Sequence, residues 1–186
     1  MKNLALLSST ALAITSGLGF GIMQSASALS WDWNYYDSGA GIDACGTFTT
    51  KDTPNSSGFY QITGITGIRN GETITGLQLT GTAIPGNEPY IVDNLISPSI
   101  VKGVPQPQLT DNGFGYSTSG GHYYNPFFTL SSPAGYYEVS YTNQQYSQPP
   151  ITFYAIPMPG RSDIFRNSSL KCDLHKPLHH KKRVSS

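Results

Sequence analysis

Charged residues, cysteines and helical patterns are all scarce in this 186-residue sequence, which contains 11 Lys and Arg, 11 Asp and Glu, and two Cys. No window shows the sustained apolar period of about 3.6 residues that an amphipathic helix requires, so an α-helical fold is not expected. No Gly-x-Ser-x-Gly motif surrounds a candidate serine nucleophile, and no acidic EF-hand-like loop is present. The sequence therefore marks out no catalytic centre, calcium site or cofactor site.

Residues 1–28 are typical of a secretory signal peptide. Lys2 is a short positive region, a run of apolar and small residues follows from Leu4 to Met23, and Ala26-Ser27-Ala28 matches an A-x-A cleavage site. We expect cleavage before Leu29 and no permanent membrane span after it, because no positive stop-transfer cluster follows the apolar run. The mature protein is predicted to be secreted or held at the bacterial cell surface.

Charge divides the remaining chain into two parts. Residues 29–160 hold nine acidic and three basic residues, a net charge of −6, whereas residues 161–186 hold seven basic and two acidic residues, a net charge of +5. The acidic part has the size of one domain, and the basic part, which lacks apolar periodicity, is predicted to be a disordered tail. Nucleic acid is not an expected partner, because a domain that binds it usually spreads positive charge over a folded face.

Short alternating segments between turn signals predict strands throughout residues 29–160. Residues 31–35 alternate aromatic and polar side chains, and residues 136–142 alternate Tyr137, Val139 and Tyr141 with Glu138 and Ser140 on the polar side. Roughly seven to nine such strands predict an all-β, single-domain antiparallel β-sandwich or jelly-roll-like fold. The strand order does not follow from the sequence.

The clearest local signal is Asn70-Gly71, which lies between two runs rich in β-branched residues and predicts a two-residue hairpin turn. The resulting register pairs Arg69 with Glu72 and Ile68 with Thr73, and continues away from the turn to a pair between Ile62 and Leu79. One face of this hairpin is expected to be buried. Its residues would be Tyr60, Ile62, Ile68, Leu77 and Leu79.

Candidate ligand-binding residues come from the abundant tyrosines. An exposed aromatic row that meets a sugar could be formed by Tyr123, Tyr124, Tyr136 and Tyr137.

Hydrolysis of a glycoside would instead require two carboxylates facing each other roughly 5–10 Å apart. Glu88 and Asp93 are close in sequence, but we interpret Glu88 as the cap of a turn and Asp93 as part of an Asx turn.

Export permits a disulfide between Cys45 and Cys172, which would tie the basic tail to an early strand. The alternative is that Cys45 fills a position where a small strand residue suffices. Cys172 is also close in sequence to three histidines of the tail, but Pro177 breaks any helix that would align them, so we expect no metal site.

A set of strand and turn segments covers most of residues 29–159: GTFTT at 46–50, ITGITG at 62–67, RNG at 69–71, ITGL at 74–77, IPGNEP at 84–89, VDN at 92–94, GFGY at 113–116 and YNPF at 124–127. These segments resemble exported bacterial proteins of the PEP-CTERM, or exosortase-sorted, class. The resemblance implies a β-rich passenger followed by a Val-Pro-Glu-Pro-like motif, an apolar span and an Arg-rich end.

The sorting segment that the resemblance implies is degenerate or missing here. Ile156-Pro157-Met158-Pro159 stands at the place of the motif, with Met158 where a Glu is expected, and no apolar span follows. A reading-frame shift near Met158 would explain the abrupt change of composition after it. The class carries no assigned molecular activity, so the resemblance implies compartment and architecture.

Together these features predict an exported, non-enzymatic structural or surface-interaction protein that uses no cofactor. Extracellular polysaccharide and cell-surface components are its expected partners. The alternative is a carbohydrate-binding module or a weakly marked glycoside hydrolase.

Overall fold

The computed structural model describes residues 28–142 and 145–158, which contain twelve strands and no helix. The strands are β1 (Leu29–Asp37), β2 (Ile42–Thr50), β3 (Tyr60–Arg69), β4 (Glu72–Leu77), β5 (Leu95–Ile96), β6 (Ile100–Val101), β7 (Val104–Pro105), β8 (Tyr116–Thr118), β9 (Tyr123–Thr129), β10 (Gly135–Thr142), β11 (Gln145–Ser147) and β12 (Pro150–Met158). The predicted N-terminal signal peptide, apart from its last residue, and the predicted basic tail lie outside the described residues.

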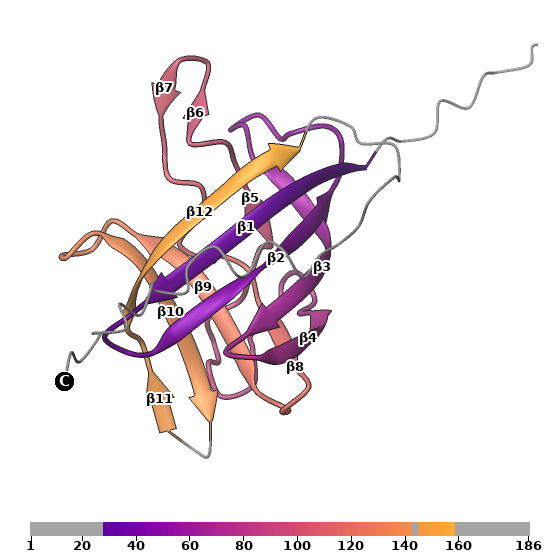
Figure 1. Cartoon of the computed structure of the whole chain (residues 1–186). Helices are drawn as coiled ribbons and strands as arrows, with labels where there is room; N and C mark the ends of the chain where they lie inside the picture. Colours follow the sequence, from indigo (N-terminus) through magenta and orange to yellow (C-terminus); the bar gives the residue numbers. More distant parts are fainter. Residues whose placement is uncertain (1–27, 143–144, 159–186) are drawn as a thin grey trace, which may run out of the picture.

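Eight of the strands form a closed antiparallel barrel in the order β10-β12-β1-β2-β3-β4-β8-β9, with β9 pairing back onto β10 (Figure 1). β11 pairs with the end of β10, β5 pairs with the start of β3, and β6 and β7 form a separate hairpin that projects from one end of the barrel. The prediction of an all-β, antiparallel fold is confirmed. The strands do not form the two facing sheets of a sandwich or jelly roll, because the pairing of β9 with β10 closes the sheet on itself.

Aromatic side chains fill the barrel interior. The alternation predicted for residues 31–35 places Trp31, Trp33 and Tyr35 of β1 inside, where all three are at most 2% exposed. Phe114 lies among them, with its ring 4.9 Å from the ring of Phe48 and 5.9 Å from that of Trp33. Each such ring buries a large apolar area, and offset or edge-on contacts between rings add to the stability. The interior is thus a packed core.

Two glycines allow strands β2 and β3 to approach each other closely. Gly46 of β2 pairs with Gly67 of β3, and on its other side lies opposite Trp33 of β1. A Cβ atom at Gly46 would lie 1.9 Å from the carbonyl oxygen of Thr66, and one at Gly67 would lie 2.2 Å from that of Cys45. Strands β2 and β3 can therefore approach this closely only without side chains at either position.

The Asn70-Gly71 turn forms as predicted. Both residues have positive φ, 48° and 84°, as a type I′ turn requires, and the pairs Arg69–Glu72 and Ile68–Thr73 are present. Farther from the turn the predicted pairing is wrong, because the two strands part. β4 pairs with β8, and the start of β3 pairs with β5.

The buried face predicted for this hairpin is correct for Ile62, which is buried, and for Tyr60 and Leu77, which pack against the core. It is wrong for Ile68 and Leu79, which are 37% and 74% exposed. Leu79 lies beyond the end of β4, where it no longer pairs with β3. For Ile68 a β-bulge is the physical reason. Thr49 of β2 pairs with Gly64, whereas the next residue, Thr50, pairs with Ile62, so that one residue of β3 has no partner and the alternation shifts by one. After the bulge Ile65 packs against the core instead of Ile68. Arg69, four residues further on, consequently faces the interior.

The long connection between β4 and β8, residues 78–115, contains the short strands β5, β6 and β7 and buries a small apolar group of its own. Ile84 and Val92 are fully buried, although neither belongs to the core inside the barrel. Gly86 lies against the ring of Tyr141 on β10, and Asn125 of β9 donates from Nδ2 to the carbonyl oxygen of Asn112 at 3.0 Å. The connection therefore packs against strands β9 and β10.

Candidate functional site

An ion pair lies inside the barrel at the end that carries the Asn70-Gly71 turn. Arg69 is the last residue of β3, and Glu138 lies on β10; their side chains are 12% and 1% exposed. Arg69 donates from Nη2 to Oε1 of Glu138 at 2.7 Å and from Nε to Oε2 at 3.1 Å. Two parallel hydrogen bonds of this kind fix both side chains in one geometry.

Three tyrosines complete this cluster. The Tyr35 hydroxyl donates to Oε2 of Glu138 and also shares a hydrogen bond with the Tyr116 hydroxyl. The ring of Tyr124 lies against the guanidinium of Arg69, with its centroid 3.9 Å from Cζ, a favourable cation–π contact. We refer to Tyr35, Arg69, Tyr116, Tyr124 and Glu138 as the interior cluster. Hydrogen bonds and ring contacts thus surround a buried pair of charges that would be costly without them.

The surroundings raise the pKa values of Tyr35, Arg69 and Tyr116, which keeps these three groups protonated. Burial raises the pKa of both Tyr35 and Tyr116 well above the ordinary tyrosine value, and the nearby Glu138 charge raises both further. Burial alone would lower the pKa of Arg69, but its hydrogen bonds to Glu138 raise it above the ordinary arginine value. The tyrosines therefore stay neutral and Arg69 stays charged at neutral pH.

A second carboxylate connects the interior cluster to the surface. Glu72, the first residue of β4, accepts a hydrogen bond from the Thr118 hydroxyl, and its Oε2 lies 3.2 Å from Nδ1 of His122. The Thr118 hydrogen bond is the main cause of the lowered pKa of Glu72. The His122 ring stands edge-on to that of Tyr124, with centroids 6.4 Å apart. His122 and Glu72 are each about one third exposed, so this pair meets solvent.

The sequence did not indicate the interior cluster. The alternation in residues 136–142 predicted Glu138 on the polar side, but it is fully buried inside the barrel. Arg69 was predicted only as the partner of Glu72 beside the turn. The one available signal was the small number of charges, since Arg69 is one of only three basic residues in positions 29–160.

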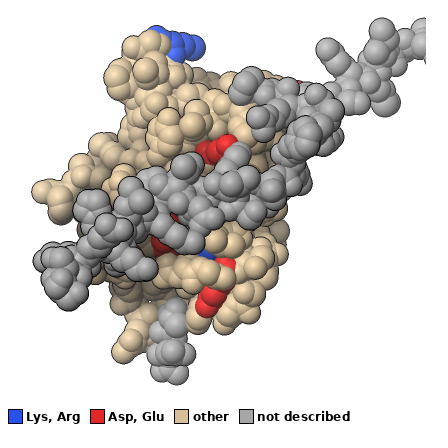
Figure 2. All heavy atoms as spheres, in the orientation of Figure 1, with Lys and Arg blue, Asp and Glu red and all other residues tan. Residues whose placement is uncertain are grey.

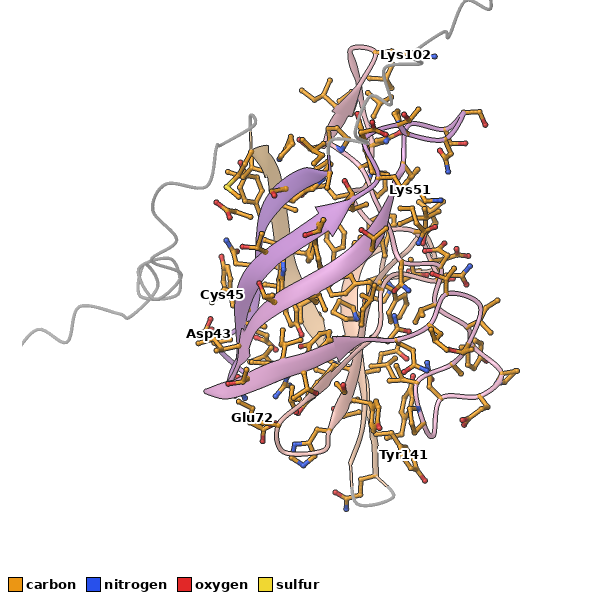
Figure 3. The ribbon with its side chains drawn as sticks, turned by 90° about the vertical axis from the view of Figure 1, so that its right-hand side faces the viewer. Asp43, Cys45, Lys51, Glu72, Lys102 and Tyr141 are labelled. Atoms are coloured by element: carbon orange, nitrogen blue, oxygen red, sulfur yellow. The ribbon has the colours of Figure 1, made fainter. Side chains whose placement is uncertain are left out.

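A groove of about 480 Å³ lies at the other end of the barrel. It is separated from Arg69 by the length of β3, which at about 3.3 Å per residue is roughly 30 Å. Figure 3 shows the two ends, with Lys51 and Lys102 toward one and Glu72 toward the other. Three segments line the groove: Phe59 before β3, residues 106–111 after β7, and residues 128–131 at the end of β9.

Exposed apolar side chains lie in the groove and in the β6–β7 hairpin next to it in the sequence. Leu130 in its lining is 85% exposed. The β6–β7 hairpin directly precedes the lining residues 106–111, and its Ile100 and Val104 are 60% and 64% exposed. Val101 of this hairpin lies close to Gly58, where an added Cβ would be 2.7 Å from its Cγ1, so the hairpin is held against the segment that precedes Phe59. We call the groove together with Ile100 and Val104 the groove face.

Polar groups are also available in the groove. The Asp111 side chain lines it from an exposed position. Nε2 of Gln106, another lining residue, is covered but has no hydrogen-bond partner within the described part of the chain. The Thr129 hydroxyl oxygen accepts a hydrogen bond from the Ser131 N–H at 3.0 Å. The groove therefore combines apolar walls with a carboxylate, an amide and hydroxyl groups.

The four tyrosines predicted as a ligand-facing row do not share one surface. Tyr124 is buried against Arg69, and Tyr136 packs against the core, where its hydroxyl oxygen accepts a hydrogen bond from the Gln108 N–H at 2.8 Å. Tyr123 and Tyr137 are half-buried, and the Tyr137 hydroxyl donates to the carbonyl oxygen of Pro133. A β-strand alternates its faces, so consecutive tyrosines point to opposite sides.

Cys45, one half of the predicted disulfide, lies on β2 opposite Asn34, on the outer side of the barrel, and is 5% exposed (Figure 3). Cys172 lies outside the described residues, so the pairing stays a prediction.

The interpretation of the two carboxylates near residue 90 as turn residues is confirmed. Oε2 of Glu88 accepts a hydrogen bond from the Gly86 N–H at 3.1 Å, and Oδ1 of Asp93 accepts one from the Leu95 N–H at 3.2 Å. Asp93 also accepts the Thr110 hydroxyl, while burial raises its pKa. Among residues 28–142 and 145–158, no group of three or more His, Cys, Asp or Glu side chains could hold a metal ion.

Comparison with known proteins found no matching family model, curated protein or solved structure. Within the described ranges no helix is long and apolar enough to cross a membrane.

Proposed function

We propose that this protein is an exported, non-enzymatic surface-interaction protein whose barrel presents the groove face to its partner. The observation that carries the proposal is the presence of exposed apolar side chains in the groove and in the hairpin that precedes residues 106–111, since Leu130, Ile100 and Val104 are each at least 60% exposed. Contiguous exposed apolar surface beside a hollow is characteristic of interaction sites.

The arrangement of the chain fits this role. Binding residues are commonly placed on loops that a rigid scaffold positions. Here the scaffold is the closed barrel with its aromatic core, and the three segments of the groove are loops or strand ends at one end of it. Among the described residues visible on the face in Figure 2, few side chains are charged.

Export is part of the proposal, and it rests on the sequence. The A-x-A site at residues 26–28 supports secretion, and the segments similar to the PEP-CTERM class support a location at the bacterial surface. The cell-surface components and extracellular polysaccharides expected as partners would both be met in that compartment.

The test is binding of the purified mature protein to the insoluble envelope fraction of the bacterium that produces it. Leu130→Asp places a charge on the rim, and Leu79→Asp is the matched control, because Leu79 is also 74% exposed but does not line the groove. We expect Leu130→Asp to weaken retention about tenfold or more, as for a residue central to an interface, and Leu79→Asp to leave it unchanged. Equal retention of both variants would contradict the proposal, and so would absence of binding by the unaltered protein.

A further inference from the structure

We propose that the groove binds an uncharged sugar unit of an extracellular polysaccharide, with Phe59 and Phe128 as its apolar walls and Gln106 and Asp111 as its hydrogen-bonding groups. This inference rests on the proposed function of the groove face and names its ligand.

The walls of the groove suit one side of a sugar ring. A pyranose has faces made of C–H groups, and the negatively polarised face of an aromatic ring attracts the positively polarised hydrogens of such a surface. Phe59 and Phe128 come from different segments but line the same groove. Phe128 is held in place by an edge-on contact with Tyr136, with ring centroids 5.1 Å apart. A positioned ring loses little conformational freedom when a ligand binds.

The polar groups suit the hydroxyl groups around the edge of a sugar. A carboxylate accepts two hydrogen bonds side by side, and an amide offers one acceptor and two donors, so both match neighbouring hydroxyls. Because Nε2 of Gln106 has no partner within the described residues, turning this side chain toward a ligand breaks no hydrogen bond of the amide nitrogen. A buried donor without a partner is also unfavourable in the free protein, and a ligand hydroxyl would satisfy it.

Size and charge narrow the class of ligand. The volume of about 480 Å³ lies within the range of about 300–1,000 Å³ that is usual for small-molecule sites. A protein partner would contact about 20–30 residues, more than the ten that line the groove. Residues 29–160 carry a net charge of −6, and one of these negative charges, Asp111, lies in the groove itself. Lys51 and Lys102 lie toward the same end of the barrel but do not line the groove, so its own charge disfavours acidic polysaccharides.

The experiment is affinity electrophoresis of the mature full-length protein through gels that contain one soluble polysaccharide. Dextran, laminarin, hydroxyethyl cellulose and galactomannan are the neutral probes, and alginate is the acidic one. We expect at least one neutral probe to retard the protein. The basic residues 161–186 can retard it in alginate by charge alone, so any retardation by alginate should not respond to Phe128→Ala. Phe128→Ala should weaken the retardation about tenfold, whereas Phe127→Ala, which removes a neighbouring ring outside the groove lining, should not.

Gln106→Ala and Asp111→Asn are the decisive variants if Phe128→Ala does not fold, because neither side chain belongs to the core. Each should weaken retardation at least about threefold while the thermal midpoint stays unchanged. Retardation by the neutral probes that none of these variants alters overturns the inference, and so does retardation by alginate that the same variants weaken equally.

The outcome also separates this inference from the proposed function. If no neutral probe retards the protein, but Leu130→Asp still abolishes binding to the envelope fraction, the proposed sugar ligand is wrong. The proposed function of the groove face is then still supported. Loss of that binding after protease treatment of the envelope would identify a protein partner. This result would also contradict the proposal that the groove binds a sugar.

Discussion

Replacing Glu138 with Gln tests whether the interior cluster stabilises the barrel. The substitution keeps the size and shape of the side chain but leaves Arg69 charged without a counter-ion, at a position where the arginine side chain is only 12% exposed. Removing one partner of a buried ion pair costs about 3–5 kcal/mol. The Gln amide can still accept one hydrogen bond, and the Tyr124 ring still contacts the guanidinium. We therefore expect a loss at the lower end of this range, about 3 kcal/mol of the free energy of unfolding.

Thermal unfolding of the mature protein, followed by near-ultraviolet circular dichroism, measures this loss. For a domain of this size one kcal/mol corresponds to about 4 °C in Tm, so Tm should fall by about 12 °C. The matched control is Glu72→Gln, which also neutralises a carboxylate beside the same turn. Its partner His122 is one third exposed, and a partly exposed pair contributes less than about 1 kcal/mol.

A double-mutant cycle then identifies the pair as the cause. Arg69→Met alone should also be destabilising, because it leaves the Glu138 charge buried. The double variant Arg69→Met with Glu138→Gln should be more stable than the sum of the single losses predicts, by about 2 kcal/mol or more. A loss of stability in Glu138→Gln no larger than that in Glu72→Gln would contradict a stabilising role of the ion pair. Additive losses of stability in the Arg69→Met and Glu138→Gln variants would contradict it too.

Two further predictions concern the barrel. Gly46→Ala should destabilise it by about 3 kcal/mol in denaturant unfolding, because the new Cβ would lie 1.9 Å from a backbone oxygen. The control Gly64→Ala should cost less than about 1 kcal/mol, because its Cβ would meet only Thr49 atoms at 3.6 Å or more. Equal losses of stability in the two variants would contradict the close approach of β2 and β3. The second prediction concerns pH, because the pKa values of Tyr35 and Tyr116 are raised in the folded state. The resulting stabilisation is fully present below the ordinary tyrosine pKa of about 10. It is lost as the pH rises above about 10 toward the raised pKa values, because the unfolded chain releases these protons first. Tyrosinate absorbance should therefore show a late group that ionises only on unfolding, and ionisation of all tyrosines in the folded protein near pH 10 would refute the assignment.

Local signals in the sequence predicted the parts of the fold that depend on neighbouring residues. The Asn70-Gly71 turn depends on backbone conformations that these two residue types allow, and the alternation in residues 31–35 depends only on the period of a strand. Both are present in the structure. The buried face of β3 was not predictable beyond Ile62, because the bulge that shifts it depends on the pairing with β2 and has no signature in β3 itself.

Closure of the barrel and the candidate sites depend on contacts between distant parts of the chain. A strand such as β9 looks the same in sequence whether it ends a sheet or pairs back onto β10, so the sequence was equally compatible with a sandwich. The ion pair joins residues 69 positions apart. The groove likewise brings together Phe59, residues 106–111 and residues 128–131. Tyrosine content does not report which face of a strand each ring occupies, so the sequence did not show that the four predicted tyrosines lie on different surfaces.

The distance between the two candidate sites allows their roles to be separated by the same set of variants. Glu138→Gln changes the interior cluster, roughly 30 Å from the groove by the length of β3, so it should lower Tm while leaving polysaccharide retardation intact at temperatures where the protein stays folded. Gln106→Ala should weaken polysaccharide retardation and leave Tm unchanged. A change in retardation caused by Glu138→Gln under those conditions would mean that the charges inside the barrel also shape the groove. The aromatic core that fills the space between the two sites would then be the physical connection, because closely packed interiors transmit strain.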